Sequence, residues 1–131
     1  MLGLAAMTGR FAVPADPHTL ATLRSIFRPL AIRHGLDDLD TAALRDGRPR
    51  ALTQAISRWI YTLTLEGAAA VAGIEFDSGH GDRLHMWASY ERVGDPAVSP
   101  HIQVLDHSPI DATESELNRA LDLPGIEWAD A

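Results

Sequence analysis

The sequences RALTQAISRWIYTL at residues 50–63, GIEFDS at 73–78, GHGDRL at 79–84 and HMWASYE at 85–91 decide the fold. The first predicts an amphipathic helix, because one stripe at helical spacing contains Leu52, Ala55, Ile56, Trp59, Ile60 and Leu63. The segments at 73–78 and 85–91 alternate apolar and polar residues, as strands do. The glycine-rich segment between them is short enough for a hairpin-type loop, so we expect an antiparallel pair. The hydroxyl of Ser78 then lies at the end of the first strand, and both faces of the second strand are expected to be covered.

The residues before this stretch predict two further helices. Asp16 can cap a helix that has Pro17 at its first position and that ends near Gly35. Pro29 lies inside this helix, which predicts a bend or two shorter helices, since proline removes a backbone hydrogen bond. Asp40 can cap a short helix over residues 41–45. The apolar repeat of the first helix consists of Leu20, Leu23, Phe27 and Leu30.

The remaining segments are less regular. Leu2, Leu4 and Met7 suit a buried helix, the start of a strand, or a surface that needs a partner. The alanine run from 68 to 72 predicts a helical or irregular connector, and residues 101–105 a third strand. Thr113 with Glu116 forms a capping-box pattern for a helix through Leu121, before an extended stretch at 126–128. Helices thus precede strands, which indicates an α+β fold with N-terminal helices followed by a small antiparallel or mixed sheet.

Composition limits the chemistry. The 131 residues are enough for one domain with a modest core. The sequence has no cysteine, which excludes thiol nucleophiles and thiolate metal sites, and fits a reducing, cytoplasmic compartment. All eleven basic residues are arginine, which excludes a lysine Schiff base and the lysine of a P-loop. The N-terminus lacks the positive region of a signal peptide, and the sequence contains no apolar run of membrane-spanning length.

The charge is unevenly distributed. Residues 1–65 contain eight arginines and five acidic residues, whereas residues 66–131 contain three arginines and thirteen acidic residues. The two halves are therefore expected to attract each other. The net charge of −7 argues against nonspecific binding to nucleic acid, which depends on clustered cationic side chains.

Several short motifs, taken in order, resemble the later half of a RES domain, a bacterial family named for an arginine, a glutamate and a serine. The motifs are Leu36-Asp37-Asp38-Leu39-Asp40, Arg50-Ala51-Leu52-Thr53-Gln54 with Ser57-Arg58, Gly73-Ile74 with Ser78, His80-Gly81-Asp82, and Trp87-Ala88 with Tyr90-Glu91. The resemblance spans residues 8–128. It implies that residues 1–131 form a single RES-like domain, truncated at its N-terminus relative to the family.

The resemblance also implies a function. RES domains resemble ADP-ribosyltransferases and consume NAD⁺ by splitting the bond between nicotinamide and ribose, often as toxins that a helix-turn-helix antitoxin neutralises. Ser78 matches the family serine and is the expected catalytic residue. Arg50, Gln54 and His80 are the expected NAD⁺-binding residues beside it, with no metal. The family arginine and glutamate belong to the earlier half, and Arg10 and Glu91 do not match their positions.

Three other interpretations remain open for Ser78 and its neighbours. A serine hydrolase would need a nucleophile elbow and an oxyanion hole, but the G-x-S-x-G pattern is absent. A metal site could use His80, His85, His101 and His107, although their spacing matches no zinc signature. The third is a non-catalytic RES-like module that binds a nucleotide or pairs with another chain. Half a sheet leaves an unpaired edge, so we expect a homo-oligomer or a complex with a complementary chain.

Overall fold

The computed structural model describes residues 2–78, 85–109, 113 and 115–122. The chain divides into two compact units, which we treat separately. The core unit consists of residues 8–101, and the ribbon unit combines residues 1–7 with residues 102–131. Helices and small sheets are both present, which confirms the predicted α+β class.

Three helices form one side of the core unit. They are α1 (Pro17–Arg33), α2 (Thr41–Asp46) and α3 (Arg50–Thr62). The predicted caps are present: an Asp16 carboxylate oxygen accepts hydrogen bonds from the backbone N–H groups of His18 and Thr19, at 3.0 and 3.1 Å. The Asp40 carboxylate likewise accepts the N–H of Ala43 at 2.8 Å. Short polar side chains thus determine where α1 and α2 begin.

Helix α1 continues through Pro29 as a single helix, so the expectation of two shorter helices is wrong. Proline removes only one backbone donor, and both sides of α1 have apolar residues in the core, Leu23 and Phe27 before Pro29 and Ala31 after it. The packing of these side chains holds the helix across the interruption. The helix ends at Arg33 with His34 as its C-cap, and Gly35 follows with a positive φ, as predicted.

The sheet of the core unit contains β2 (Phe11–Ala12), β5 (Gly73–Asp77) and β6 (His85–Ser89), in the order β2-β5-β6. Strands β5 and β6 pair antiparallel from Gly73 opposite Ser89 to Asp77 opposite His85, which confirms the predicted pair. Strand β2 adds in parallel to β5, which makes the sheet mixed. Only glycine fits at position 73, because a Cβ there would collide with the carbonyl oxygen of Ala88.

A short hairpin replaces the predicted alanine connector. Strands β3 (Thr64–Leu65) and β4 (Ala68–Ala69) pair antiparallel. Both residues of the turn between them, Glu66 and Gly67, have positive φ angles, of 53° and 82°. Such a two-residue turn matches the twist of the flanking strands, so the turn outweighs the helical tendency of the alanines.

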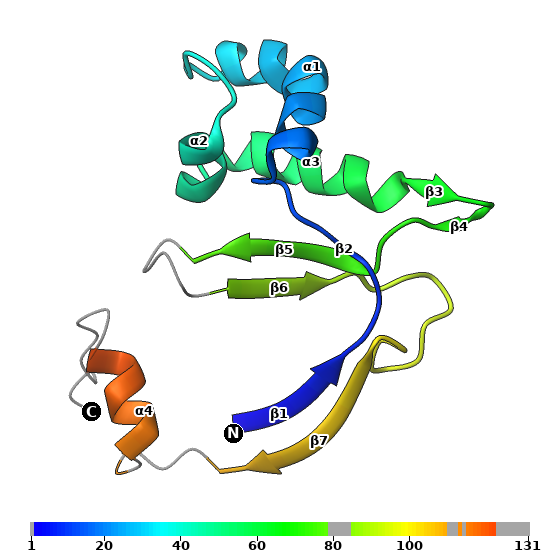
Figure 1. Ribbon diagram of the computed structural model, residues 1–131, viewed down its shortest axis with the longest axis vertical. Coiled ribbons are helices and arrows are strands. Elements are labelled where there is room, and N and C mark those ends of the chain that lie inside the picture. Colours follow the sequence, from blue (N-terminus) through cyan, green and yellow to red (C-terminus); the bar gives the residue numbers. More distant parts are fainter. Residues whose placement is uncertain (1, 79–84, 110–112, 114, 123–131) are drawn as a thin grey trace. The chain divides into compact units, whose positions relative to one another are not determined.

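The hydrophobic core lies among the three helices, on the side of the sheet where Figure 1 shows α1, α2 and α3 together. Its buried residues are Leu23, Phe27, Ala31, Leu39, Ala43, Leu52, Ile56 and Ile60. Strand β6 differs from expectation. Met86 and Trp87 of β6 keep nearly half of their surface exposed, so the prediction that both faces of this strand are covered is wrong.

The ribbon unit contains β1 (Leu2–Met7), β7 (Ile102–Ser108) and α4 (Ser115–Asp122). Strands β1 and β7 pair antiparallel, with an irregularity between Leu4 and Ala5. The chain therefore begins with a strand, and the predicted order of helices before strands is wrong. Helix α4 and β7 confirm the elements predicted near residues 113–121 and 101–105, whereas residues 126–128 lie outside the described residues.

Candidate functional site

A pocket of about 420 Å³ lies in the core unit between α2, α3 and the ends of β5 and β6. This volume is in the usual range for small-molecule sites. The lining is mainly apolar with a few polar groups, which suits an organic ligand that is oriented by hydrogen bonds. The residues that line it are Pro14, Ala15, Thr41, Leu44, Arg45, Gly47, Arg50, Thr53, Gln54, Ile56, Ser57, Ile60, Ile74, Phe76, Asp77, Ser78 and Met86.

Three of the four site residues expected from the sequence line this pocket. Arg50 and Gln54 lie one turn apart on α3, and Ser78 follows the last residue of β5. Helix α3 and β5 bring these residues to one cavity although they are 24 to 28 positions apart in the chain. His80, the fourth, lies outside the described residues. Ser78 is buried, with 8% of its surface exposed, at the wall of the pocket.

Asp77 places a carboxylate at the same cavity, where Arg45 and His85 contact it. Its Oδ2 lies 3.2 Å from Nη2 of Arg45, which comes from α2. Its Oδ1 lies 3.2 Å from Nδ1 of His85, on the paired strand. The ion pair with Arg45 connects the end of β5 to α2, and it joins two of the elements that enclose the pocket. Sequence reasoning missed Arg45, because nothing local links it to Asp77.

A second polar group lies behind α3. The Tyr90 hydroxyl donates to the backbone carbonyl of Ser57 at 2.8 Å and lies 3.1 Å from the Ser57 hydroxyl. Burial raises the pKa of Tyr90 above its usual value of 10.0, while the hydrogen bond with Ser57 and the charge of Arg92 act in the opposite direction. Tyr90 thus attaches the chain after β6 to the helix that lines the pocket.

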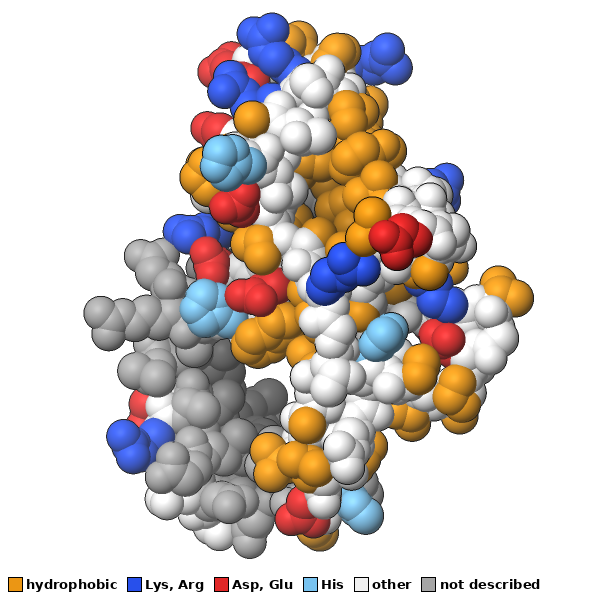
Figure 2. All heavy atoms as spheres, turned by 45° about the vertical axis from the view of Figure 1, so that its right-hand side comes forward, with side chains coloured by type: hydrophobic (Ala, Val, Ile, Leu, Met, Phe, Trp, Pro, Cys, Tyr) orange, Lys and Arg blue, Asp and Glu red, His pale blue; other side chains and the backbone are white. Residues whose placement is uncertain are grey.

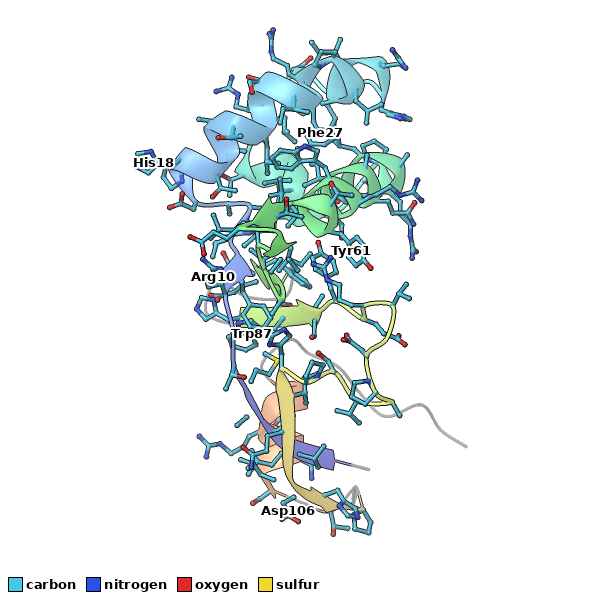
Figure 3. The ribbon with its side chains drawn as sticks, turned by 90° about the vertical axis from the view of Figure 1, so that its right-hand side faces the viewer. Arg10, His18, Phe27, Tyr61, Trp87 and Asp106 are labelled. Atoms are coloured by element: carbon cyan, nitrogen blue, oxygen red, sulfur yellow. The ribbon has the colours of Figure 1, made fainter. Side chains whose placement is uncertain are left out.

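Arg92 fixes the end of α3. Its guanidinium donates to the carbonyls of Tyr61 at 2.7 Å and Val71 at 3.1 Å. The Tyr61 carbonyl is one of the last in α3, so no backbone N–H of the helix donates to it. Arg92 supplies a donor instead. The same guanidinium lies over the Tyr61 ring, 3.9 Å from its centroid, and Tyr61 contacts Tyr90 edge to face. Figure 3 shows Tyr61 on the side of α3 that faces the strands.

Of the histidines in the metal hypothesis, His80 lies outside the described residues, and His85 lies beside the carboxylates of Glu75 and Asp77. Over residues 2–78, 85–109, 113 and 115–122, no group of three or more His, Asp or Glu side chains is arranged to hold a metal ion. Within the same residues, no helix has the length and apolar character needed to cross a membrane. Searches against models of protein families, curated proteins and solved structures found no match.

Proposed function

We propose that this chain is a RES-like protein whose pocket binds NAD⁺, and that NAD⁺ breakdown is its activity. The observation that supports the proposal is the shared pocket of Arg50, Gln54 and Ser78, the described residues that the motif resemblance assigns to NAD⁺. The motifs that carry the resemblance are ordered along the chain, and this order alone does not place their residues close together in space. Their meeting at one cavity is what a ligand site requires.

The residues suggest a division of roles along the pocket. Arg50 supplies positive charge for a phosphate oxygen of the pyrophosphate, and among the described residues its guanidinium has no ion-pair partner. Its place at the start of α3 adds the favourable field of a helix N-terminus. Gln54 and Ser78 supply hydrogen bonds to the ribose or the nicotinamide amide. The apolar side chains of Ile56, Ile74 and Phe76 supply the surface that a nucleobase or nicotinamide ring needs.

Splitting the bond between nicotinamide and ribose develops positive charge on the ribose, which a carboxylate stabilises. Asp77 is the acidic residue among the described residues that line the pocket, but its ion pair with Arg45 offsets its charge. This favours the second candidate function, a RES-like module that binds NAD⁺ without cleaving it. A complementary chain that carries the missing arginine and glutamate, or an antitoxin-type partner, would then complete or control the site. We place the protein in the cytoplasm, because a cysteine-free chain fits a reducing compartment and the proposed ligand, NAD⁺, is found there.

The deciding experiment combines two measurements on the purified chain. Calorimetric titration with NAD⁺ tests binding, and chromatography of nicotinamide released from NAD⁺ tests cleavage, with and without the products of neighbouring genes. Binding with cleavage supports the enzyme, and binding without cleavage under all conditions supports the second candidate. If NAD⁺ does not bind at millimolar concentration, both candidates are wrong.

A further inference from the structure

A second depression in the core unit lies along the outer side of α3. It is a groove of about 1000 Å³ between α1, α3 and Tyr90. Its floor contains one stripe of α3, which recurs at three and four residues over the whole helix. The stripe consists of Ala51, Gln54, Ala55, Arg58, Trp59 and Thr62. Ile26 and Phe27 of α1 form one wall of the groove. Tyr61 and Tyr90 also line it.

The lining has the composition of a protein-binding surface. Four of the eight aromatic residues of the chain, Phe27, Trp59, Tyr61 and Tyr90, lie in this groove. Phe27 and Trp59 pack edge to face, with their ring centroids 6.0 Å apart, which fixes both rings. Tryptophan, tyrosine and arginine are the residues that most often dominate binding energy at interfaces. Figure 3 shows Phe27 between α1 and α3, and Figure 2 shows hydrophobic side chains gathered over the helical part.

The charge of the two helices determines the kind of partner. Together α1 and α3 carry five arginines and no acidic residue. Arg24 and Arg28 pair with Asp38, whereas Arg33, Arg50 and Arg58 have no ion-pair partner among the described residues. Arg58 lies exposed in the groove itself. A partner with acidic side chains beside an apolar face is therefore complementary to this surface.

The shape of the groove determines the form of the partner. From Ala51 to Thr62 the stripe extends roughly 16 Å, at 1.5 Å per residue. The two alanines provide a shallow surface on which another helix can lie closely, with its apolar positions at every third or fourth residue. Such a helix needs about three turns, or roughly 11 residues, to fill the groove. A second copy of this chain is a poor fit, because its long helices α1 and α3 contain no acidic residue and α4 has only 8 residues.

We infer that the groove between α1 and α3 is a docking site for an acidic, amphipathic helix of another protein. Trp59 and the two alanines of the floor bury the apolar face of that helix, and Arg58 pairs with an acidic residue on its flank. The site is separate from the proposed NAD⁺ pocket, although Gln54 and Ser57 border both. The inference does not depend on the proposed function.

The test uses a designed helical peptide of about 18 residues, long enough to be helical in solution, with leucine and alanine on one face and glutamate on the other. Calorimetry with the full chain is expected to show binding that weakens with salt. A peptide with lysine in place of glutamate is the matched control and is expected not to bind. Arg58→Glu should weaken binding at least about tenfold, because it places like charges in contact. Ala51→Glu, which places an acidic side chain in the floor of the groove, should do the same.

Arg33→Glu is the control variant, since Arg33 lies on α1 outside the groove and the charge change is the same. It should change affinity less than about threefold. If the glutamate peptide does not bind, if the lysine peptide binds equally well, or if Arg33→Glu weakens binding as much as Arg58→Glu, the docking site is refuted. A dimer in sedimentation velocity that Arg58→Glu dissociates would show that a second copy occupies the groove, which would refute the assigned partner. Melting curves of each variant establish that it is folded.

Discussion

At the residue scale, Asp77 and Ser78 are neighbours in sequence but differ in surroundings. Asp77 ends β5, stays partly exposed and lies against Arg45 and His85, whereas Ser78 is buried. Both residues line the pocket, so each can contact a ligand, and Asp77 also connects β5 to α2.

Replacing Ser78 with alanine should weaken NAD⁺ binding by at least about tenfold, the effect of losing a hydrogen bond of roughly 1.4 kcal/mol to a polar ligand. The free energy of unfolding should fall by only about 1 kcal/mol, because one hydroxyl is removed. Titration calorimetry and urea unfolding measure the two effects. Ser89→Ala is the control, since Ser89 lies on β6 outside the pocket. Equal NAD⁺ affinity for wild type and Ser78→Ala would remove Ser78 from the site.

Replacing Tyr90 with phenylalanine removes the hydroxyl that donates to Ser57, and should cost about 1 kcal/mol of stability at neutral pH. The raised pKa of Tyr90 means that the folded protein holds the phenol proton more tightly than the unfolded chain. Stability from this hydroxyl is therefore present below about pH 10 and declines as pH rises through the folded pKa. Urea unfolding from pH 8 to pH 11 should show wild type approaching the variant. A constant difference across this range would show that Tyr90 does not ionise differently on folding.

At the element scale, two carboxylates hold α1. Asp16 accepts backbone N–H groups at its start, and Asp38 pairs with arginines on its exposed side. The N–H of Thr19 lowers the pKa of Asp16, with smaller effects from His18. The N–H of Leu39 lowers the pKa of Asp38, and Arg24 adds to this. Asp38 in turn pairs with Arg24 and Arg28 on the exposed side of α1, which connects the helix to the segment that follows it.

Acid should therefore lower the stability that these two carboxylates give to α1. Because both pKa values are lower in the folded protein, stability from these groups is complete above the unfolded value of 3.8 and is lost as pH falls through the folded values. Asp16→Ala should lower the melting temperature at pH 7, and the difference from wild type should shrink as the pH falls and the wild-type carboxylate takes up a proton. Thermal unfolding followed by circular dichroism measures this. Asp37→Ala, an exposed neighbour of Asp38, is the control and should behave like wild type at each pH.

Elements with strong local signals could be predicted from the sequence. The caps of α1 and α2, the apolar stripe of α3 and the β5–β6 pair were all visible in short patterns. The β3–β4 hairpin was missed because alanine favours helix, and the turn at Glu66 and Gly67 outweighs that tendency. Strand β1 was ambiguous, because Leu2, Leu4 and Met7 fit a helix and a strand equally well. Within the site, Arg50, Gln54 and Ser78 could be found from motifs, whereas the pairing of Arg45 with Asp77 depends on tertiary structure.

At the scale of the whole molecule, the two units differ in how they are stabilised. Every residue of the hydrophobic core cluster lies between Leu23 and Ile60, within the core unit. The described residues of the ribbon unit consist of one strand pair and one short helix, with Leu4, Val104 and Leu105 exposed. A two-stranded ribbon alone is marginally stable in water. The ribbon unit also carries seven acidic residues and one arginine, a balance of −6, whereas the core unit is nearly neutral.

A fragment of residues 8–101 should therefore fold without the ribbon unit. It keeps the whole core, the sheet of β2, β5 and β6, and the hydrogen bond from the Thr8 N–H to the His101 carbonyl near its ends. Its melting temperature should lie within about 5 °C of the full chain, equivalent to roughly 1 kcal/mol for a unit of this size. Circular dichroism and calorimetry measure the transition. A fragment that does not unfold cooperatively would show that the ribbon unit contributes to the stability of the core.

Gly73 has a consequence for the search for relatives. Because a Cβ there would collide with the Ala88 carbonyl, a library of all substitutions selected for folded protein should lose every replacement at this position. Exposed positions such as Val93 should accept most of them. Over evolutionary time the same restriction would keep a glycine at the start of β5 while the surrounding surface diverges. A relative of this chain is therefore expected to have a glycine at this position, five residues before the serine that lines the pocket.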